Sequence, residues 1–205
     1  MGPGKNRLAT SHTTMTRSRK PNQLRIIAGT WRGRKLGFPV VAGLRPTPDR
    51  VRETVFNWLA PVLPGARCLD LFAGSGALGF EAASRGAARV VLVERDAQVL
   101  QELWGNVATL GASQVQVVAA EALNYLAGSA APFDIVLLDP PYDRPDLLAA
   151  CCTQLETGGW LAPQARIYLE TRGKTCLPVL PGNWELVRSK HAGQVAYHLA
   201  VRNPM

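Results

Sequence analysis

The sequence predicts an α/β fold, a mostly parallel sheet of seven strands with helices on both faces, preceded by a small N-terminal hairpin and helix. Three observations support this prediction. Short apolar runs alternate with helical segments from residue 67 onward, a glycine turn follows the first run, and acidic residues end several runs. Such alternation is typical of parallel sheets, which bind ligands at the carboxyl ends of their strands.

The length and composition fit one globular unit. The chain has 205 residues, of which 47% are hydrophobic, and at this length roughly 70% of the extended surface can be buried. No apolar run reaches the roughly 18 residues of a membrane helix, and the N-terminus lacks the apolar segment of a signal peptide. Four cysteines without a C-x-x-C pair indicate a reducing compartment. We therefore expect a soluble cytoplasmic monomer with no membrane contact and no metal site.

Positive charge is concentrated at the N-terminus. Residues 1–52 contain twelve Lys or Arg against one acid, a net +11, whereas the whole chain carries +8, so the remainder is at −3. A basic segment on a slightly acidic body predicts a polyanionic partner, most simply nucleic acid. Residues 1–23 are rich in Ser and Thr, with few apolar side chains, and are expected to form a disordered basic tail.

Residues 24–64 predict a hairpin and a helix that contact RNA. Two short apolar runs about a glycine turn indicate the hairpin, and near its second run Trp31 stands among Arg32, Arg34 and Lys35. This cluster either binds RNA phosphates or is a solvated face.

A helix is expected from Pro48 to about Ala60. Thr47 is the predicted N-cap, and proline suits the first helical position. Basic residues around the helix start either line the substrate entrance or face solvent, namely Arg45, Arg50 and Arg52.

Residues 65–205 predict the main domain. Strands are expected near 67–72, 89–94, 114–119, 133–138 and 165–170, helices near 76–85, 96–109, 121–127 and 145–156, and a closing antiparallel pair at 184–189 and 194–201.

The glycine turn after the first core strand predicts a cofactor site. Gly74, Gly76 and Gly79 match the spacing G-x-G-x-x-G, which alone is a weak sign of a dinucleotide. Asp70, four residues before the first glycine, would repel a pyrophosphate at the mouth of the turn. S-adenosylmethionine has a cationic amine and a sulfonium and no phosphate, so this acid favours it over NAD.

Glu94 ends the next strand, twenty residues after Gly74. An acid at this place binds the ribose of a nucleoside cofactor, whether NAD or S-adenosylmethionine. Glu94 therefore supports such a cofactor without choosing between the two.

The run Asp139-Pro140-Pro141-Tyr142 ends the fourth core strand and indicates which reaction the site performs. The prolines remove two N–H donors, so the Asp139 carboxylate and the Pro140 carbonyl can converge on an amine as acceptors. Accepting both protons of an exocyclic base amine localises its lone pair toward a methyl donor. The Tyr142 ring offers a face on which an unstacked base can lie.

These motifs resemble the bacterial 16S rRNA guanine-N2 methyltransferases, a class I S-adenosylmethionine-dependent family. The resemblance covers residues 24–201 and rests on the Asp-Pro-Pro-Tyr run and on the segments 25–36, 44–59, 70–79 and 192–197. It implies a Rossmann-like fold and methylation of guanine 966 in 16S rRNA or the small ribosomal subunit. It assigns the cofactor to Asp70, Phe72, Gly74, Gly76 and Glu94 and the guanine to Asp139, Pro140 and Tyr142. Glu121, where the family usually has Asn or Asp, is expected near the adenine.

Other functions remain open from the residues alone. The Asp-Pro-Pro-Tyr chemistry also suits adenine N6 in DNA or RNA. A nicotinamide-dependent oxidoreductase shares the glycine turn, and a basic RNA-binding protein without catalysis shares the charge pattern.

Overall fold

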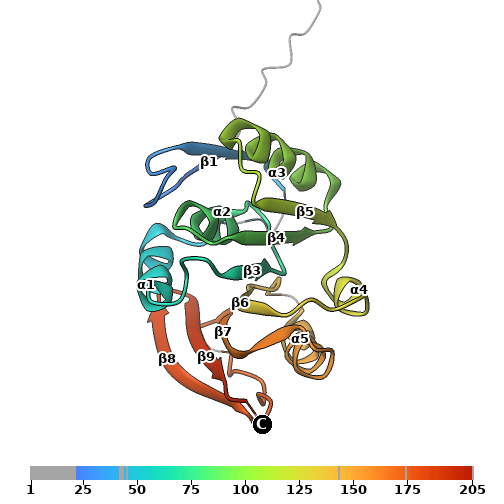
Figure 1. The fold of residues 1–205 in the computed structure, drawn as a ribbon. Helices are drawn as coiled ribbons and strands as arrows, with labels where there is room; N and C mark the ends of the chain where they lie inside the picture. The colour runs from blue at the N-terminus through green and yellow to red at the C-terminus, as the bar shows by residue number, and fades with distance from the viewer. Residues whose placement is uncertain (1–21, 42–43, 45, 143, 174, 205) are drawn as a thin grey trace, which may run out of the picture.

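The computed structural model describes residues 22–41, 44, 46–142, 144–173 and 175–204. Within these residues the chain forms a sheet of seven strands, in the order β5-β4-β3-β6-β7-β9-β8, and a separate two-stranded hairpin, β1-β2 (Figure 1). Residues 1–21 of the predicted basic tail lie outside the described residues. Asn22 and Gln23, which the prediction placed in that tail, belong to β1.

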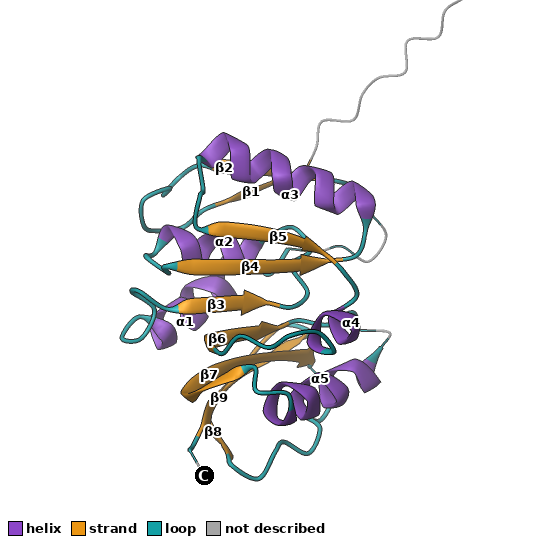
Figure 2. Cartoon of the chain, turned by 45° about the vertical axis from the view of Figure 1, so that its right-hand side comes forward, coloured by secondary structure: helices purple, strands orange, loops and turns teal. Residues whose placement is uncertain are grey.

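The large sheet confirms the predicted α/β architecture. Five strands run parallel and the last two close the sheet antiparallel (Figure 2). The strands are β3 (Arg67–Asp70), β4 (Arg89–Glu94), β5 (Val115–Ala119), β6 (Phe133–Leu138), β7 (Leu161–Arg172), β8 (Trp184–Ala192) and β9 (Val195–Arg202).

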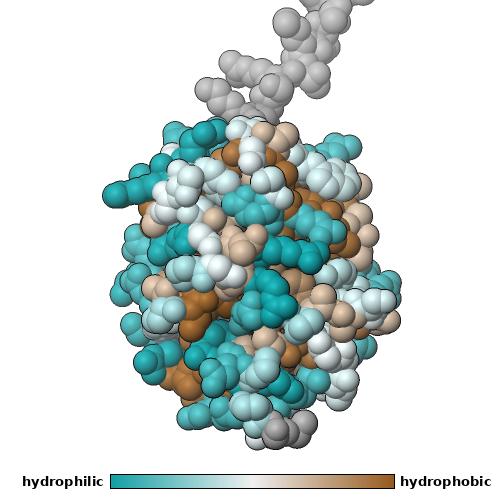
Figure 3. Space-filling view, viewed as in Figure 1, coloured by the Kyte–Doolittle hydropathy of each residue, from teal (hydrophilic) through white to brown (hydrophobic). Residues whose placement is uncertain are grey.

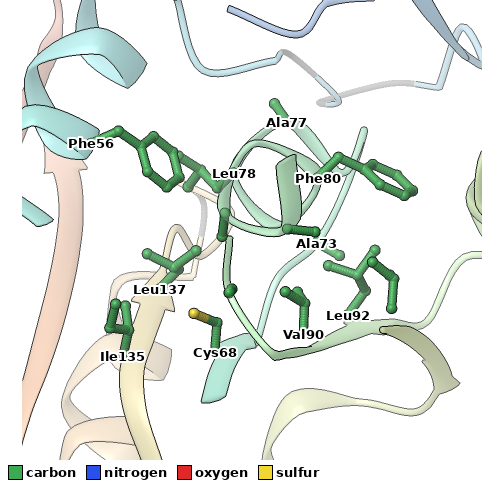
Figure 4. Close-up of a cluster of buried hydrophobic side chains, with 14 of the residues drawn as sticks. Phe56, Cys68, Ala73, Ala77, Leu78, Phe80, Val90, Leu92, Ile135 and Leu137 are labelled. Atoms are coloured by element: carbon green, nitrogen blue, oxygen red, sulfur yellow. The ribbon is translucent and has the colours of Figure 1, made fainter. Parts of the chain in front are cut away.

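Helices cover both faces of this sheet, as the alternating pattern predicts. They are α1 (Asp49–Leu59), α2 (Ala77–Ser84), α3 (Ala97–Leu110), α4 (Ala122–Leu126) and α5 (Pro145–Thr157). Adjacent strand residues point to opposite faces, so Cys68 joins the core beneath α1 and α2, whereas Leu69 joins the core beneath α4 and α5. Figure 4 shows the first core, in which Phe56 and Leu78 lie above Cys68.

The hairpin of β1 (Asn22–Arg25) and β2 (Lys35–Phe38) packs into that first core. Leu24, Ile26 and Leu36 are buried with residues of α1, α2 and β4. The N-terminal segment is therefore continuous with the main hydrophobic core. Hydrophilic side chains are spread over the face of Figure 3, among smaller hydrophobic areas.

Two details of α1 differ from expectation. Pro48, not Thr47, occupies the N-cap position, and no side chain caps the helix. Arg52 neither faces solvent nor lines an entrance, because it is 1% exposed and pairs with the buried Glu81 at 3.3 Å. A buried guanidinium needs such partners, and the carbonyl oxygen of Arg25 also accepts from it at 2.9 Å.

Candidate active site

Three predicted acids meet at the carboxyl edge of the sheet. Asp70 is the last residue of β3 and pairs in register with Leu92 of β4 and Leu137 of β6. Glu94 and Asp139 each stand two residues beyond those partners on the neighbouring strands. Because the three strands are parallel, their ends bring the side chains to one edge.

The glycine turn leads from β3 into α2 with left-handed backbone at two positions. Gly74 has φ +50° and Gly76, the N-cap of α2, has φ +76°. A Cβ on Gly76 would lie 2.5 Å from ring atoms of Phe80, and one on Gly74 would lie 3.0 Å from Leu44 Cδ1. The turn therefore requires glycine at both positions, and the segment before α1 lies against it.

Asp70 lies beneath this turn. It is 1% exposed, and its Oδ2 accepts the N–H of Gly79, in the first turn of α2, at 3.0 Å. Burial raises the pKa of the carboxyl to about 7, although the N–H groups of Gly79 and Phe72 oppose this shift. Asp70 thus holds the first turn of α2 in place, directly after the glycine turn.

Glu94 is held at the side of the turn. Its carboxylate accepts the N–H of Gly74 at 2.9 Å, of Arg95 at 2.7 Å and of Asp96 at 2.9 Å. Glu121, after β5, is exposed and pairs with the Arg95 guanidinium at 2.7 Å. Asp70 beneath the turn and Glu94 at its side make this place more suitable for a cationic ligand than for a pyrophosphate. The Asp70 carboxyl is buried, however, and does not stand at the mouth of the turn as the sequence predicted.

Tyr142 lines a hollow of about 240 Å³ beyond the end of β6, together with Pro140 and Pro141. Tyr142 is 47% exposed, with its ring on the hollow and its hydroxyl donating to Glu170 Oε1 at 2.8 Å. The wall includes Pro140, Pro141, Tyr142, Leu148, Glu170, Thr171, Arg172, Thr175, Cys176 and Pro178. The hollow can accept a planar group against the tyrosine face.

Glu170, on β7, lines the same hollow and is not among the candidates that the sequence analysis named. It is 3% exposed and also accepts the Tyr168 hydroxyl at 2.7 Å. Burial, and next the charge of Glu170, raise the pKa of Asp139 well above its ordinary value, while a hydrogen bond from Thr47 lowers it. Glu170 is an acid near the end of an apolar strand, the same signal that identified Glu94, so this pattern could have found it.

The predicted RNA-contact residues divide between two edges of the molecule. Arg34 donates to the carbonyl of Thr109 at 3.1 Å, near the end of α3, and Trp31 N–H donates to Ser84 Oγ at 3.0 Å, at the end of α2. These helix ends lie at the amino edge of the sheet, so Arg32 and Arg34 are remote from Asp139. Arg50 is exposed in the first turn of α1, three residues after Thr47. Arg45 lies outside the described residues.

The described residues contain neither a metal-binding cluster nor a membrane-spanning helix. Among the described residues there is no group of three or more His, Cys, Asp or Glu that could hold a metal ion. In the same part of the chain, no helix is both long and apolar enough to span a bilayer.

Three comparisons with known proteins agree on one family for this chain. The family model described as "Conserved hypothetical protein 95" matches residues 24–201. Ribosomal RNA small subunit methyltransferase D of Escherichia coli K12 is 54% identical over 189 residues, which cover 90% of this chain and 95% of that protein. The protein of the same name from Haemophilus influenzae is 44% identical, covering 90% and 98%. The solved structure of yhhF from Escherichia coli has a TM-score of 0.82 and 53% identity, covering 90% of this chain and all of that one.

Proposed function

The chain belongs to the ribosomal RNA small subunit methyltransferase D family, and from this premise we propose that it methylates the exocyclic N2 of guanine 966 in 16S rRNA. The fold is that of the class I methyltransferases, and the enzyme is an S-adenosylmethionine-dependent rRNA methyltransferase. The observation that carries the choice of an amine is the position of Asp139 and Pro140. These acceptors directly follow β6, and Pro140 lines the hollow beside Tyr142.

S-adenosylmethionine fits the residues around the turn. The dipole at the N-terminus of α2 favours a carboxylate, and the nearby acids suit an ammonium and a sulfonium. Gly74 and Gly76 admit close backbone approach, and Phe72 borders the turn. In this proposal Glu94 accepts from the ribose hydroxyls and Glu121 from the adenine amine. When bound, the cofactor supplies an electrophilic methyl group on sulfur.

The chain's own residues prepare the amine. A guanine that lies on the Tyr142 ring places its N2 near the end of β6. Asp139 and the Pro140 carbonyl accept its two N–H hydrogens and so direct its lone pair outward. Much of the rate is attributed to this alignment, because positioning of reactants alone can supply large effective molarities.

RNA is held through phosphate contacts in this proposal. Arg50 lies next to the segment that reaches Asp139, and Arg172 lines the hollow. Arg32, Arg34 and Lys35 are exposed at the amino edge, where they can contact a more distant part of the rRNA. An rRNA substrate places the reaction in the cytoplasm, and the enzyme is proposed to act as a monomer.

The test is transfer of labelled methyl from S-adenosylmethionine to small subunits that lack the modification, and separately to naked 16S rRNA, followed by nucleoside analysis. We expect N2-methylguanosine, which is lost when the target guanine is replaced by adenine. Labelled N6-methyladenosine would instead establish the adenine alternative. NADH that competes with S-adenosylhomocysteine in calorimetry would contradict the cofactor assignment.

A further inference from the structure

The carboxyl groups of Asp139 and Glu170 form a hydrogen-bonded pair beneath the proposed guanine site. Asp139 and Glu170 directly follow Leu138 and Leu169, the last register pair of the adjacent strands β6 and β7. They are 31 positions apart in the chain, and their side chains hydrogen-bond to each other. Two hydroxyls converge on the same group, since Tyr168 donates to Glu170 Oε2 at 2.7 Å and Tyr142 donates to Oε1 at 2.8 Å. Each Glu170 oxygen therefore has its own phenol.

Such an arrangement requires one proton between the two carboxyls. Two carboxylates in contact inside a protein do not both ionise, because burial and mutual repulsion oppose it. The hydroxyl donors favour an ionised Glu170, which leaves the proton on Asp139. In agreement, burial raises the pKa of both groups, the charge of Glu170 raises that of Asp139 further, and hydrogen bonds from Tyr168, Tyr142 and Asp139 lower that of Glu170.

We propose that Glu170 is a positioning residue for methyl transfer, which orients Asp139 and takes over the shared proton when the base amine gives one up. This inference rests on the proposed function and adds a residue to it. Glu170 does not touch the base. It acts through Asp139, by fixing one carboxyl oxygen in the pair, and through Tyr142, by fixing the ring.

The proton balance follows from this geometry. Before reaction, Asp139 donates its proton to Glu170 and keeps its other oxygen as an acceptor for one N–H of the amine. As the N2 lone pair forms the C–N bond, the C–S bond breaks and its electrons stay on sulfur. The positive amine then gives a proton to the free Asp139 oxygen, and the shared proton passes to Glu170. The pair changes from one negative charge to neutral, and the product amine is neutral.

The charged and titratable groups that face the pair come from several elements. Asp70 approaches from β3, Tyr142 from the segment after β6, and Tyr168 and Arg172 from β7. Tyr197 of β9 pairs in register with Glu170, and Lys190 of β8 pairs in register with Tyr197. The segment before α1 contributes the Thr47 hydroxyl. Tyr168 is the closest of these to Glu170 and can lose its hydroxyl without losing its ring.

Two substitutions separate this role from a structural one. Glu170→Gln keeps the shape and removes the charge, so kcat should fall at least about tenfold, within the range of proton-transfer contributions, while the Kd values for S-adenosylhomocysteine and RNA change less than about twofold. Tyr168→Phe removes a donor to the ionised Glu170, which raises the lower pKa of the pair. Its acidic limb of kcat against pH should therefore move to higher pH. Tyr125→Phe is the matched control, because that ring packs against Trp160 in the other core.

The pair can also be observed without substrate. In protein with ¹³C-labelled Asp and Glu carboxyls, the Asp139 signal should titrate well above the usual range for aspartate and should move to lower pH in Glu170→Gln. An unchanged Asp139 titration in Glu170→Gln, or a rate loss equal at every pH in both variants, would overturn the proposal. If the unaltered enzyme forms no N2-methylguanosine, the proposed function fails, and the NMR titration still decides whether the pair exists.

Discussion

The backbone N–H of Ile27 donates to Glu81 Oε2 at 2.9 Å, and this bond joins the hairpin segment to the helix that begins at the cofactor turn. The neighbouring Ala28 N–H donates to Oε1 of the same carboxylate at 3.0 Å. Glu81 is fully buried and also pairs with Arg52 and Arg85. Its burial is tolerated because four donors surround it. The hairpin is therefore a fixed part of the enzyme's core and not a loosely attached arm.

Gly29→Ala should detach the hairpin from α2, with Gly33→Ala as its control. Both glycines have φ near +80°, so alanine costs each site a similar backbone strain of about 1 to 2 kcal/mol. A Cβ at Gly29 would lie 1.8 Å from the Ser84 carbonyl oxygen, whereas nothing lies within 4 Å of one at Gly33. Urea unfolding should show a clearly larger loss of stability for Gly29→Ala. Equal losses of stability in the two variants would mean that the hairpin moves away from Ser84 without a measurable change in stability.

Asp139→Ala should reduce methyl transfer at least about tenfold while S-adenosylmethionine still binds. Removal of the carboxyl takes away an acceptor for the amine and leaves the glycine turn intact. Asp139→Asn should be milder, since the amide oxygen remains an acceptor. Single-turnover kinetics and calorimetry with S-adenosylhomocysteine measure the two effects separately. Full activity in Asp139→Ala would contradict the assigned chemistry.

Tyr142→Ala should impair turnover more than Tyr142→Phe, because stacking on an aromatic face contributes about 1 to 3 kcal/mol per base. The phenylalanine variant keeps that face and loses only the hydroxyl donated to Glu170. Competition binding of a short RNA that contains the target guanine measures the difference. Similar affinity in both variants would place the base elsewhere.

Replacement of Arg32, Arg34 and Lys35 together should weaken RNA binding and make its salt dependence less steep. The slope should fall by about 0.7 to 0.9 for each RNA phosphate that these side chains neutralise. Because Arg32 and Arg34 lie at the edge opposite Asp139, kcat at saturating RNA should stay unchanged. Arg50→Ala, beside the site, should lower both affinity and kcat, and cofactor affinity serves as the control in each variant. If the salt slope of the triple variant equals that of the unaltered protein, these side chains are only a solvated face.

Asp70→Asn should change how stability depends on pH. The folded pKa of Asp70, about 7, lies above its ordinary value of 3.8, so the folded state binds its proton more tightly. Asp70 therefore contributes stability that is fully present below pH 4 and is lost as the pH rises toward 7. Relative to the unaltered protein, the asparagine variant should gain stability between pH 4 and 7. Thermal unfolding at several pH values measures this difference, and a difference that does not vary with pH would contradict it.

Local patterns in the chain determined the fold and the sheet edge that the acids of the proposed site share. Alternating apolar runs predicted all seven strands of the large sheet, and the strand-end positions of Asp70, Glu94 and Asp139 predicted that they share one edge. These inferences succeed because strand periodicity and parallel topology set the direction of each side chain within a few residues. The roles proposed for the Asp-Pro-Pro-Tyr run and for the glycine turn likewise rest on residues adjacent in the chain.

Only the tertiary structure decided which distant residues act together. Glu170 contacts Asp139 because β7 lies beside β6, and the pKa of each carboxyl depends on that contact and on burial. Arg52 resembles a surface residue in the chain, yet packing places it against Glu81 in the core. The basic residues of the hairpin likewise lie at the edge away from Asp139, because Glu81 and Ser84 dock that segment at the far end of α2. Charge and composition are properties of the sequence, but burial, pairing and distance depend on how the strands and helices pack.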